Sequence, residues 1–151
     1  MGWTNKPSSF IQTVEADITK RQKDIVIDAL GGVVMQSPVD EGTFRASHRV
    51  SINQQDMTFN ESEKDKNGTP TINKGEAVIS RLVPYSTVYI QTNAPYATAI
   101  EFGQYPKPVK KGSYDKKAKR YVIKSINGFS QQAPQGVYSI TFNYIAQKYG
   151  G

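Results

Sequence analysis

A run of apolar residues at helical spacing between residues 10 and 34 is the strongest constraint that this sequence places on its fold. Polar side chains such as Asp17, Lys23 and Asp28 occupy the other side of the same stretch. The stripe predicts an amphipathic helix over residues 10–35, about 39 Å long, that buries one face against the rest of the chain. Its apolar positions are Phe10, Ile11, Val14, Ile18, Ile25, Val26, Ala29, Leu30, Val33 and Val34.

Local signals mark both ends of this helix. Ser9 followed by Gln12 has the pattern of a capping box, so we expect the helix to start there. Pro38 disfavours helical dihedral angles at Ser37 and ends the helix. The glycine pair at residues 31–32 disfavours a helix by about 1 kcal/mol per residue. The helix therefore either bends at this pair or packs closely against another backbone, and we favour close packing.

The middle of the chain combines a turn, short strands and one long loop. Residues 40–42 indicate a turn in which Asp40 accepts from the following amides, with one helical turn after it. Residues 49–53, 76–80 and 86–92 have the patterns of strands. Residues 54–75 are polar without apolar periodicity, so we expect a long loop there.

The last third of the chain predicts two helices and a strand. Pro95 suits the start of a helix that Gly103 ends. Residues 121–125 are a further strand candidate. Pro134 suits the first turn of a closing helix, whose apolar residues at 137–145 repeat at helical spacing.

This order predicts an α+β fold in one domain over residues 1–151. The N-terminal and C-terminal helices would pack on an antiparallel sheet, with two long loops or arms at residues 54–75 and 104–131. At 151 residues with 37% hydrophobic content, the chain suits a single core. It contains no cysteine, which excludes disulfides and thiolate metal sites and fits a reducing cytoplasm.

Positive charge is concentrated in one segment. Residues 107–124 carry eight bases and one acid, Asp115, so this segment has a charge of +7, while the whole chain has +6. The remainder is therefore close to neutral. Tyrosines lie among these bases, a composition that suits phosphate contact with some stacking, although a solvated arm or a protein-docking arm explains it as well. The bases are Lys107, Lys110, Lys111, Lys116, Lys117, Lys119, Arg120 and Lys124.

Three short motifs stand beside apolar stretches: SPVDEG at residues 37–42, NAPY running on to EFG within residues 93–103, and QAPQG at residues 132–136. Each is a turn or cap built from proline, glycine and a polar partner, and none has the residue types of a catalytic centre. We interpret them as structural. The motif residues, with one nearby arginine, are Ser37, Pro38, Asp40, Gly42, Arg45, Asn93, Pro95, Tyr96, Glu101, Gly103, Ala133, Pro134 and Gly136.

In this order and register, the motifs resemble the tail-completion or neck family of long-tailed bacteriophages, over residues 10–146. In most members of that family the second motif leads almost directly into the third. Here residues 104–131 are inserted between them. The resemblance therefore implies nothing about the inserted segment, which contains the concentrated positive charge.

The resemblance implies a structural virion protein at the joint between head and tail, present in the host cytoplasm during assembly. It implies a homo-oligomer, expected to be a six-fold ring, that contacts the capsid connector, other neck proteins, and the tail tube or its terminator protein. A terminator ring that caps the tail tube is the alternative, and a module that contacts genomic DNA through the basic segment is another.

The residues themselves offer little for catalysis. His48 is the sole histidine, and we expect it to be a surface or strand-edge residue rather than a general base. No nucleophile elbow and no phosphate-binding glycine loop is present, so we expect neither enzyme activity nor a cofactor. Asp40, Arg45 and Glu101 are candidates for an ion-pair lock between the first two motifs, the alternative being separate solvation.

The chain has neither the signal core of a secreted protein nor an apolar run long enough to span a membrane. We therefore expect a soluble protein without membrane contact.

Overall fold

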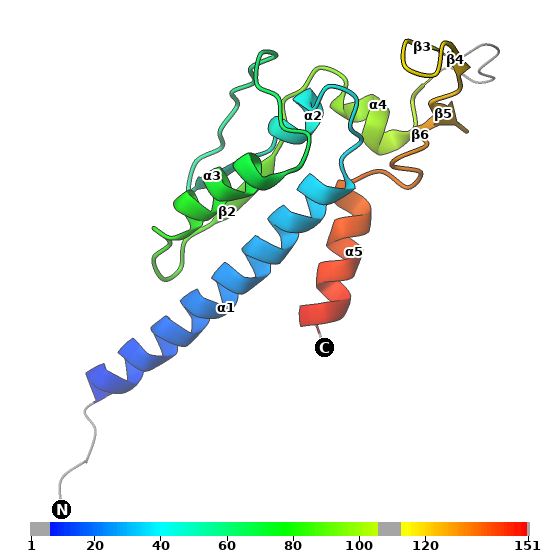
Figure 1. Ribbon diagram of the computed structural model, residues 1–151. Helices are drawn as coiled ribbons and strands as arrows, with labels where there is room; N and C mark the ends of the chain where they lie inside the picture. Colours follow the sequence, from blue (N-terminus) through cyan, green and yellow to red (C-terminus); the bar gives the residue numbers. More distant parts are fainter. Residues whose placement is uncertain (1–6, 106–112, 151) are drawn as a thin grey trace, which may run out of the picture.

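The predicted α+β fold is confirmed: a long N-terminal helix and a C-terminal helix lie with small antiparallel sheets (Figure 1). The computed structural model describes residues 7–105 and 113–150. The helices are α1 (Pro7–Gln36), α2 (Thr43–Ala46), α3 (Thr69–Ile79), α4 (Ala97–Phe102) and α5 (Tyr138–Tyr149). The strands are β1 (Arg49–Ile52), β2 (Val88–Gln91), β3 (Ser113–Asp115), β4 (Arg120–Val122), β5 (Ser125–Ile126) and β6 (Phe129–Ser130).

Helix α1 is unbroken over 30 residues, or about 45 Å. Ser9 lies inside its first turns, where the Ser9 carbonyl accepts a hydrogen bond from Thr13 Oγ1 (3.0 Å). The expected capping box is therefore wrong. Only the C-terminal half of α1 is buried, and its core residues are Val26, Leu30, Val33 and Val34.

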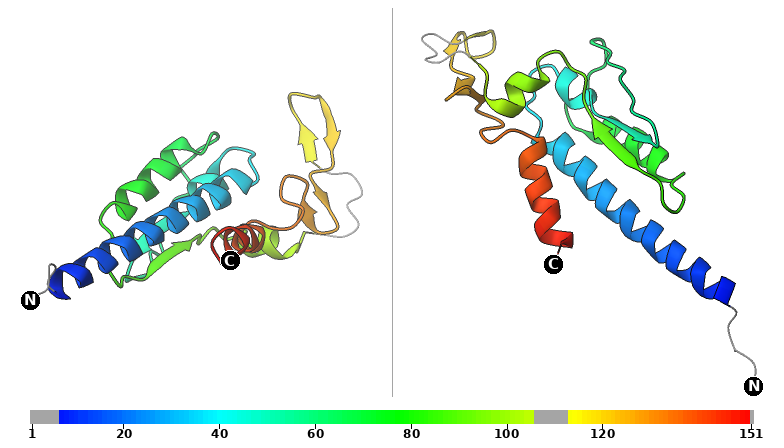
Figure 2. Two further views of the ribbon diagram at one scale, coloured as in Figure 1. Left: turned by 90° about the horizontal axis from the view of Figure 1, so that it is seen from below. Right: turned by 180° about the vertical axis from the view of Figure 1, so that it is seen from behind.

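Helices α3 and α5 both pack against α1, and α3 also covers β1 (Figure 2). The partner of α5 is thus mainly α1, rather than the sheet on which we expected it to pack. The end of α5 is fastened to α1, because Lys148 Nζ lies 2.7 Å from Asp28 Oδ2 and Arg21 donates to the carbonyl of Tyr149 (2.7 Å).

Helix α3 corrects the sequence analysis, which expected a loop over residues 54–75 and a strand over residues 76–80. The helix follows Gly68, whose backbone is left-handed (φ 91°), and Pro70 lies in its first turn. Its buried face consists of Thr71, Gly75 and Ile79. Small and polar residues occupy two of these three positions, so the apolar periodicity that marks a helix is missing from the sequence.

Two glycines let helices approach closely. A Cβ atom on Gly75 would lie 2.2 Å from Leu30 Cδ2, and one on Gly32 would lie 2.7 Å from Thr141 Cγ2. Close packing at Gly32 is therefore confirmed, but the neighbour is the side chain of Thr141 in α5 and not another backbone. A Cβ atom on Gly31 would meet no described atom within 4 Å, so this glycine needs no such explanation.

The sheet at the body of the molecule is the antiparallel pair β1–β2, in which Val50 lies opposite Ile90. Both strands fall inside the predicted ranges. Asn53 (φ 62°) follows β1 and exchanges hydrogen bonds with Thr87, since its amide donates to the Thr87 carbonyl and its Oδ1 accepts the Thr87 amide. Val50 joins the core formed by α1, α3, α4 and the start of α5.

The inserted segment forms two hairpins, β3–β4 and β5–β6, in place of the single strand expected over residues 121–125. Its two ends are joined to each other, because the amide of Tyr105 donates to the carbonyl of Gly128 (3.0 Å), and its base is attached to the body because β6 packs on α4. The β3–β4 hairpin stands at the end of the molecule opposite the N-terminal half of α1 (Figure 1).

Candidate functional site

The three sequence motifs meet in one place, which we call the motif junction. It is formed by the end of α1, the α2–β1 turn, the end of α4 and the start of α5. The residues that define it are Ser37, Val39, Arg45, His48, Glu101, Gln132, Gly136 and Tyr138.

A hydrogen-bonded chain of side chains runs through the junction. His48 Nε2 lies 2.6 Å from Ser37 Oγ, and His48 Nδ1 lies 2.7 Å from Tyr138 Oη. His48 is only 4% exposed, so the expectation of a surface or edge histidine is wrong. Burial, followed by the charges of Arg49 and Arg45, lowers the pKa of His48 to about 3.

The direction of these hydrogen bonds argues against a serine nucleophile. Ser37 Oγ has one hydrogen and donates it to the carbonyl of Val33 (2.5 Å), which can only accept. Ser37 Oγ must therefore accept from His48 Nε2–H, and His48 Nδ1 accepts from the Tyr138 hydroxyl. A histidine base would instead accept the serine proton. The hydrogen bonds from His48 to Ser37 and Tyr138 thus link the end of α1 to α5.

Glu101 binds the first turn of α5. Its Oε2 accepts from the amides of Val137 (2.8 Å) and Tyr138 (2.9 Å), and its Oε1 accepts from the amide (2.8 Å) and hydroxyl (2.7 Å) of Ser139. Although partial burial acts to raise it, these hydrogen bonds lower the pKa of Glu101 below its usual value. The ionised carboxylate satisfies amides that a helix leaves unpaired at its start.

Arg45 closes the other side of the junction through backbone carbonyls. It donates to the carbonyls of Lys66 (2.6 Å), Met35 (3.2 Å) and Ser37 (3.3 Å). It therefore satisfies carbonyl groups near the end of α1.

The expected ion-pair lock of Asp40, Arg45 and Glu101 is wrong, because each of the three has other partners. Asp40 Oδ1 lies 3.5 Å from Lys124 Nζ, at the base of the inserted segment. The amides expected to bind Asp40 do not do so among the described residues, and Gly42, with φ 94°, forms the turn itself.

The third motif is tied to the first by a side chain that the sequence analysis did not single out. Gln132 Oε1 accepts from the amide of Val39 (2.8 Å), and Gln132 Nε2 donates to the carbonyl of Val39 (3.0 Å). Gly136 has φ 81°, and a Cβ atom there would lie 2.8 Å from the Glu101 carbonyl. Pro134 pairs with Gly136 before α5 begins, so its predicted place in the first helical turn is wrong.

The remaining motif residues have structural positions. Gly103 ends α4 as predicted, with φ 67°, and its missing Cβ leaves room for the ring of Phe129. Tyr96 packs on Phe44, with ring centroids 5.9 Å apart. Asn93 donates to the carbonyl of Asp56 (3.2 Å). Ala133 and Ser37 are both buried. Pro38 follows the end of α1, and Pro95 lies in the turn before α4, which begins at Ala97.

Sequence reasoning also missed Asp65, which lies in the expected loop. Asp65 Oδ1 accepts from the amide of Gly68 (2.7 Å), and Oδ2 accepts from the amide (2.9 Å) and hydroxyl (2.6 Å) of Thr71. The available signal was an aspartate a few residues before a proline, which is typical of a helix start. Because Asp65 is 4% exposed, the end of this loop is fixed to the body.

Two surfaces outside the junction carry exposed side chains in the described part of the chain. The N-terminal half of α1 exposes large apolar side chains beyond the end of α5 (Figure 1). They are Phe10 (68% exposed), Ile11 (53%), Val14 (36%) and Ile18 (44%). The second surface is the basic hairpin, defined as residues 113–124, which carries Lys116, Lys117, Lys119, Arg120 and Lys124. Lys107, Lys110 and Lys111 lie outside the described residues.

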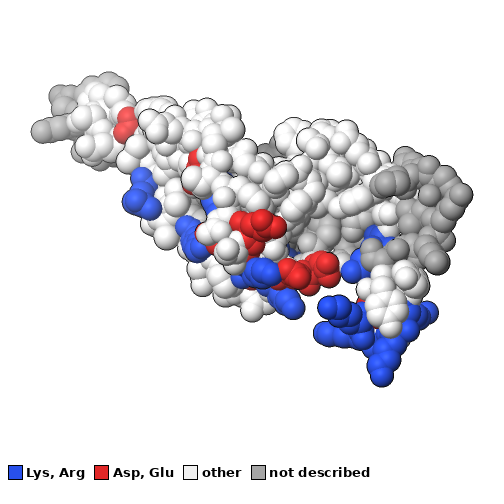
Figure 3. Space-filling view, turned by 90° about the horizontal axis from the view of Figure 1, so that it is seen from above, with Lys and Arg blue, Asp and Glu red and all other residues white. Residues whose placement is uncertain are grey.

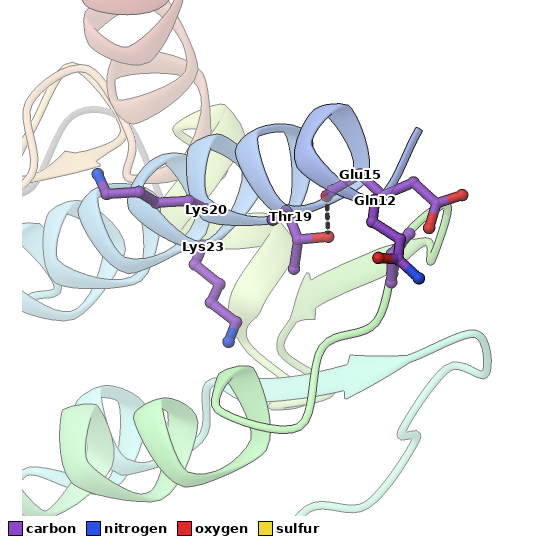
Figure 4. A pocket seen from close by; sticks show the side chains of 7 residues that line it. Gln12, Glu15, Thr19, Lys20 and Lys23 are labelled. Atoms are coloured by element: carbon purple, nitrogen blue, oxygen red, sulfur yellow. Dashed lines mark hydrogen bonds between the residues drawn. The ribbon is translucent and has the colours of Figure 1, made fainter. Parts of the chain in front are cut away.

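An open groove of about 480 Å³ lies between α1 and the loop at Pro84 (Figure 4). Thr19 donates to the carbonyl of Glu15 within it (2.8 Å), and Lys20 pairs with Asp24. Its lining groups are thus solvated or satisfied within α1. The arrangement offers no nucleophile beside a base. The lining residues are Gln12, Glu15, Ala16, Thr19, Lys20, Lys23 and Pro84.

Within residues 7–105 and 113–150, no cluster of three or more histidine or acidic side chains is placed to hold a metal ion. In the same part of the chain, no helix is both long and apolar enough to cross a membrane. Comparison with protein-family models, with curated proteins and with solved structures gave no match.

Proposed function

We propose that this chain is a structural, non-enzymatic protein of the joint between the head and tail of a long-tailed bacteriophage. In this role it completes the tail and joins it to the capsid connector. The observation that carries the proposal is the motif junction. The motifs that give the chain its resemblance to tail-completion proteins bind one another through Glu101, Gln132 and the His48 chain of hydrogen bonds.

The chemistry of the junction supports an architectural role. Its polar side chains are used for helix ends and turns, and the one buried serine and histidine pair has the wrong hydrogen-bond direction for nucleophilic catalysis. A subunit of an assembly needs a body of fixed shape, and a satisfied buried network provides rigidity.

The uncovered apolar face of α1 supports assembly with neighbouring copies. The N-terminal half of α1 extends beyond the rest of the folded chain (Figure 2). It carries the exposed apolar residues Phe10, Ile11, Val14 and Ile18. Contiguous exposed apolar residues mark protein-protein contacts. We propose that a neighbouring copy covers this face in a ring, expected to be six-fold, at the head-to-tail joint.

The test is to delete the gene in its phage and to image the particles. We expect heads and tails to accumulate unjoined, and the chain supplied from a plasmid to restore joined particles. In restored virions, density for α1 and the motif junction should form a ring at the joint. Purified virions that lack the chain by mass spectrometry would rule the proposal out.

A terminator ring that caps the tail tube is the second candidate, favoured by the same exposed face because both roles need a ring. The two roles differ in where the chain first binds. Isolated tails from a phage that makes no heads should contain the chain if it is a terminator, and should lack it if it acts only when heads join tails.

A further inference from the structure

We infer that the basic hairpin is an arm that binds the phosphate backbone of nucleic acid without reading base sequence. The inference goes beyond the head-to-tail proposal and does not depend on it, since binding can be measured on the isolated chain. It starts from the way in which the hairpin uses its charges.

The hairpin is a short ribbon whose one acid is occupied by its own turn. Tyr114 lies opposite Tyr121, and Asp115 lies opposite Arg120. Asp115 Oδ1 accepts from the amides of Lys117 (2.8 Å) and Ala118 (3.0 Å). The carboxylate therefore organises the turn, and it forms no ion pair with a described cation, although, after these hydrogen bonds, the charges of Lys124 and Lys117 contribute to lowering its pKa.

The cations of the hairpin are exposed and mostly unpaired. Lys124 alone forms an ion pair, with Asp40 at 3.5 Å. The other four cations form no ion pair with any described residue; they are Lys116, Lys117, Lys119 and Arg120. Figure 3 shows the Lys and Arg side chains gathered on this projecting part of the surface. Four neighbouring positive charges repel one another, and a dense row of negative charges would relieve this repulsion.

Nucleic acid fits this surface better than an acidic protein does. A DNA duplex carries one negative charge per about 1.7 Å of its axis, a density that matches closely spaced lysines. A two-stranded ribbon, about 5 Å between strands, also enters a major groove about 12 Å wide. The paired rings of Tyr114 and Tyr121, 5.4 Å apart and both exposed, add a surface for sugars and bases.

The kind of cation indicates binding that is independent of sequence. Three of the four unpaired cations are lysines, which act as flexible point charges, whereas base readout relies mainly on bidentate side chains such as arginine. Phosphate contacts position a protein on nucleic acid and carry no sequence information directly. A sliding or loosely held contact is therefore the expected mode.

The test is fluorescence anisotropy of the full chain with a short labelled DNA duplex as salt is varied. With five cations engaged, the slope of log K against log salt should be about −4.5, so that affinity falls about 500-fold from about 50 to about 200 mM salt. The variant with Lys116→Gln, Lys117→Gln, Lys119→Gln and Arg120→Gln should reduce the size of the slope by about 3.6. Two duplexes of unrelated sequence should bind alike.

The matched control removes three lysines and one arginine elsewhere: Lys20→Gln, Lys64→Gln, Lys74→Gln and Arg81→Gln, all exposed. It should keep the wild-type slope. Equal slopes for the two quadruple variants, or no binding by the wild-type chain at about 50 mM salt, would overturn the inference. Binding of polyglutamate as tight as binding of the duplex would also overturn it, in favour of an acidic protein partner.

Discussion

The carboxylate of Glu101 accepts the backbone amide of Val137 at 2.8 Å, across 36 residues of chain that include the whole inserted segment. The same carboxylate binds the next two amides of α5. The second and third motifs are therefore joined directly in space even though an insertion separates them in sequence. The insertion leaves the body at this point and returns to it.

The Glu101 contact gives the first prediction. Glu101→Gln replaces one carboxylate oxygen with an amide group that cannot accept from the first turn of α5. We expect a loss of about 1–3 kcal/mol in the free energy of unfolding, measured by urea denaturation. Glu76→Gln, at an exposed position of α3, should change it by less than about 0.5 kcal/mol. Equal effects of the two changes would contradict the capping role.

His48 predicts a pH dependence of stability. Its pKa is lowered to about 3 in the folded chain, so the native state stays unprotonated while the unfolded state takes up a proton near pH 6.5. Stability should be complete above about pH 6.5 and fall as the pH decreases, with a slope approaching 1.4 kcal/mol per pH unit.

The contribution of His48 can be measured by itself between about pH 6.5 and about pH 5. The carboxylates of Asp65 and Glu101, whose pKa values are also lowered, lose their stabilising contribution only at lower pH. His48→Gln removes the only histidine and should flatten the dependence in this window. Urea denaturation at several pH values measures it, and an unchanged slope in the variant would refute the assignment.

Two helical glycines offer a matched pair of alanine substitutions. Gly75→Ala should destabilise the protein by about 1–3 kcal/mol, because the new methyl group would overlap the buried side chain of Leu30. Gly31→Ala meets nothing within 4 Å and should stabilise α1 by about 0.5–1 kcal/mol. Thermal unfolding compares them, and a Gly75→Ala variant as stable as the wild-type chain would show that α1 and α3 do not pack as closely as described.

The sequence predicted the elements whose apolar residues repeat and whose ends carry glycine or proline. Helix α1, the strands β1 and β2, and the end of α4 at Gly103 follow from such patterns. Helix α3 was missed because its contact with α1 uses Thr71 and Gly75, which carry no hydrophobic signal. Packing that depends on small residues is visible only when the partner helix is placed.

The motif junction was predicted in its residues but not in its contacts. The turns identified Ser37, Glu101 and Gly136 as structural, yet charge alone suggested that Arg45 would pair with an acid. Arg45 binds carbonyls instead, and Glu101 binds amides. Unpaired backbone groups at helix ends compete for charged side chains, and a sequence does not show which helix ends lie nearby. His48 could not be recognised as buried, because its partner Tyr138 is distant in the sequence and comes close only in the fold.

The exposed face of α1 gives the last prediction, in which stability and assembly separate. Replacing Phe10, Ile11, Val14 and Ile18 by serine removes side chains that are 36–68% exposed, so the free energy of unfolding should change little, by about 1 kcal/mol or less. If a neighbouring copy covers this face, the same variant should fail to enter particles. Leu30→Ala, in the buried half of α1, should instead cost about 2–5 kcal/mol.

Complementation of a gene deletion, with particles counted by electron microscopy and the variant detected by mass spectrometry, measures assembly separately from folding. Normal incorporation of the serine variant would exclude this face as the contact between copies. The four substituted residues are not part of the buried core of the chain. Loss of incorporation with unchanged stability would therefore point to a contact that forms only between copies. The N-terminal half of α1 would then be a helix whose apolar side is completed only in the assembled particle.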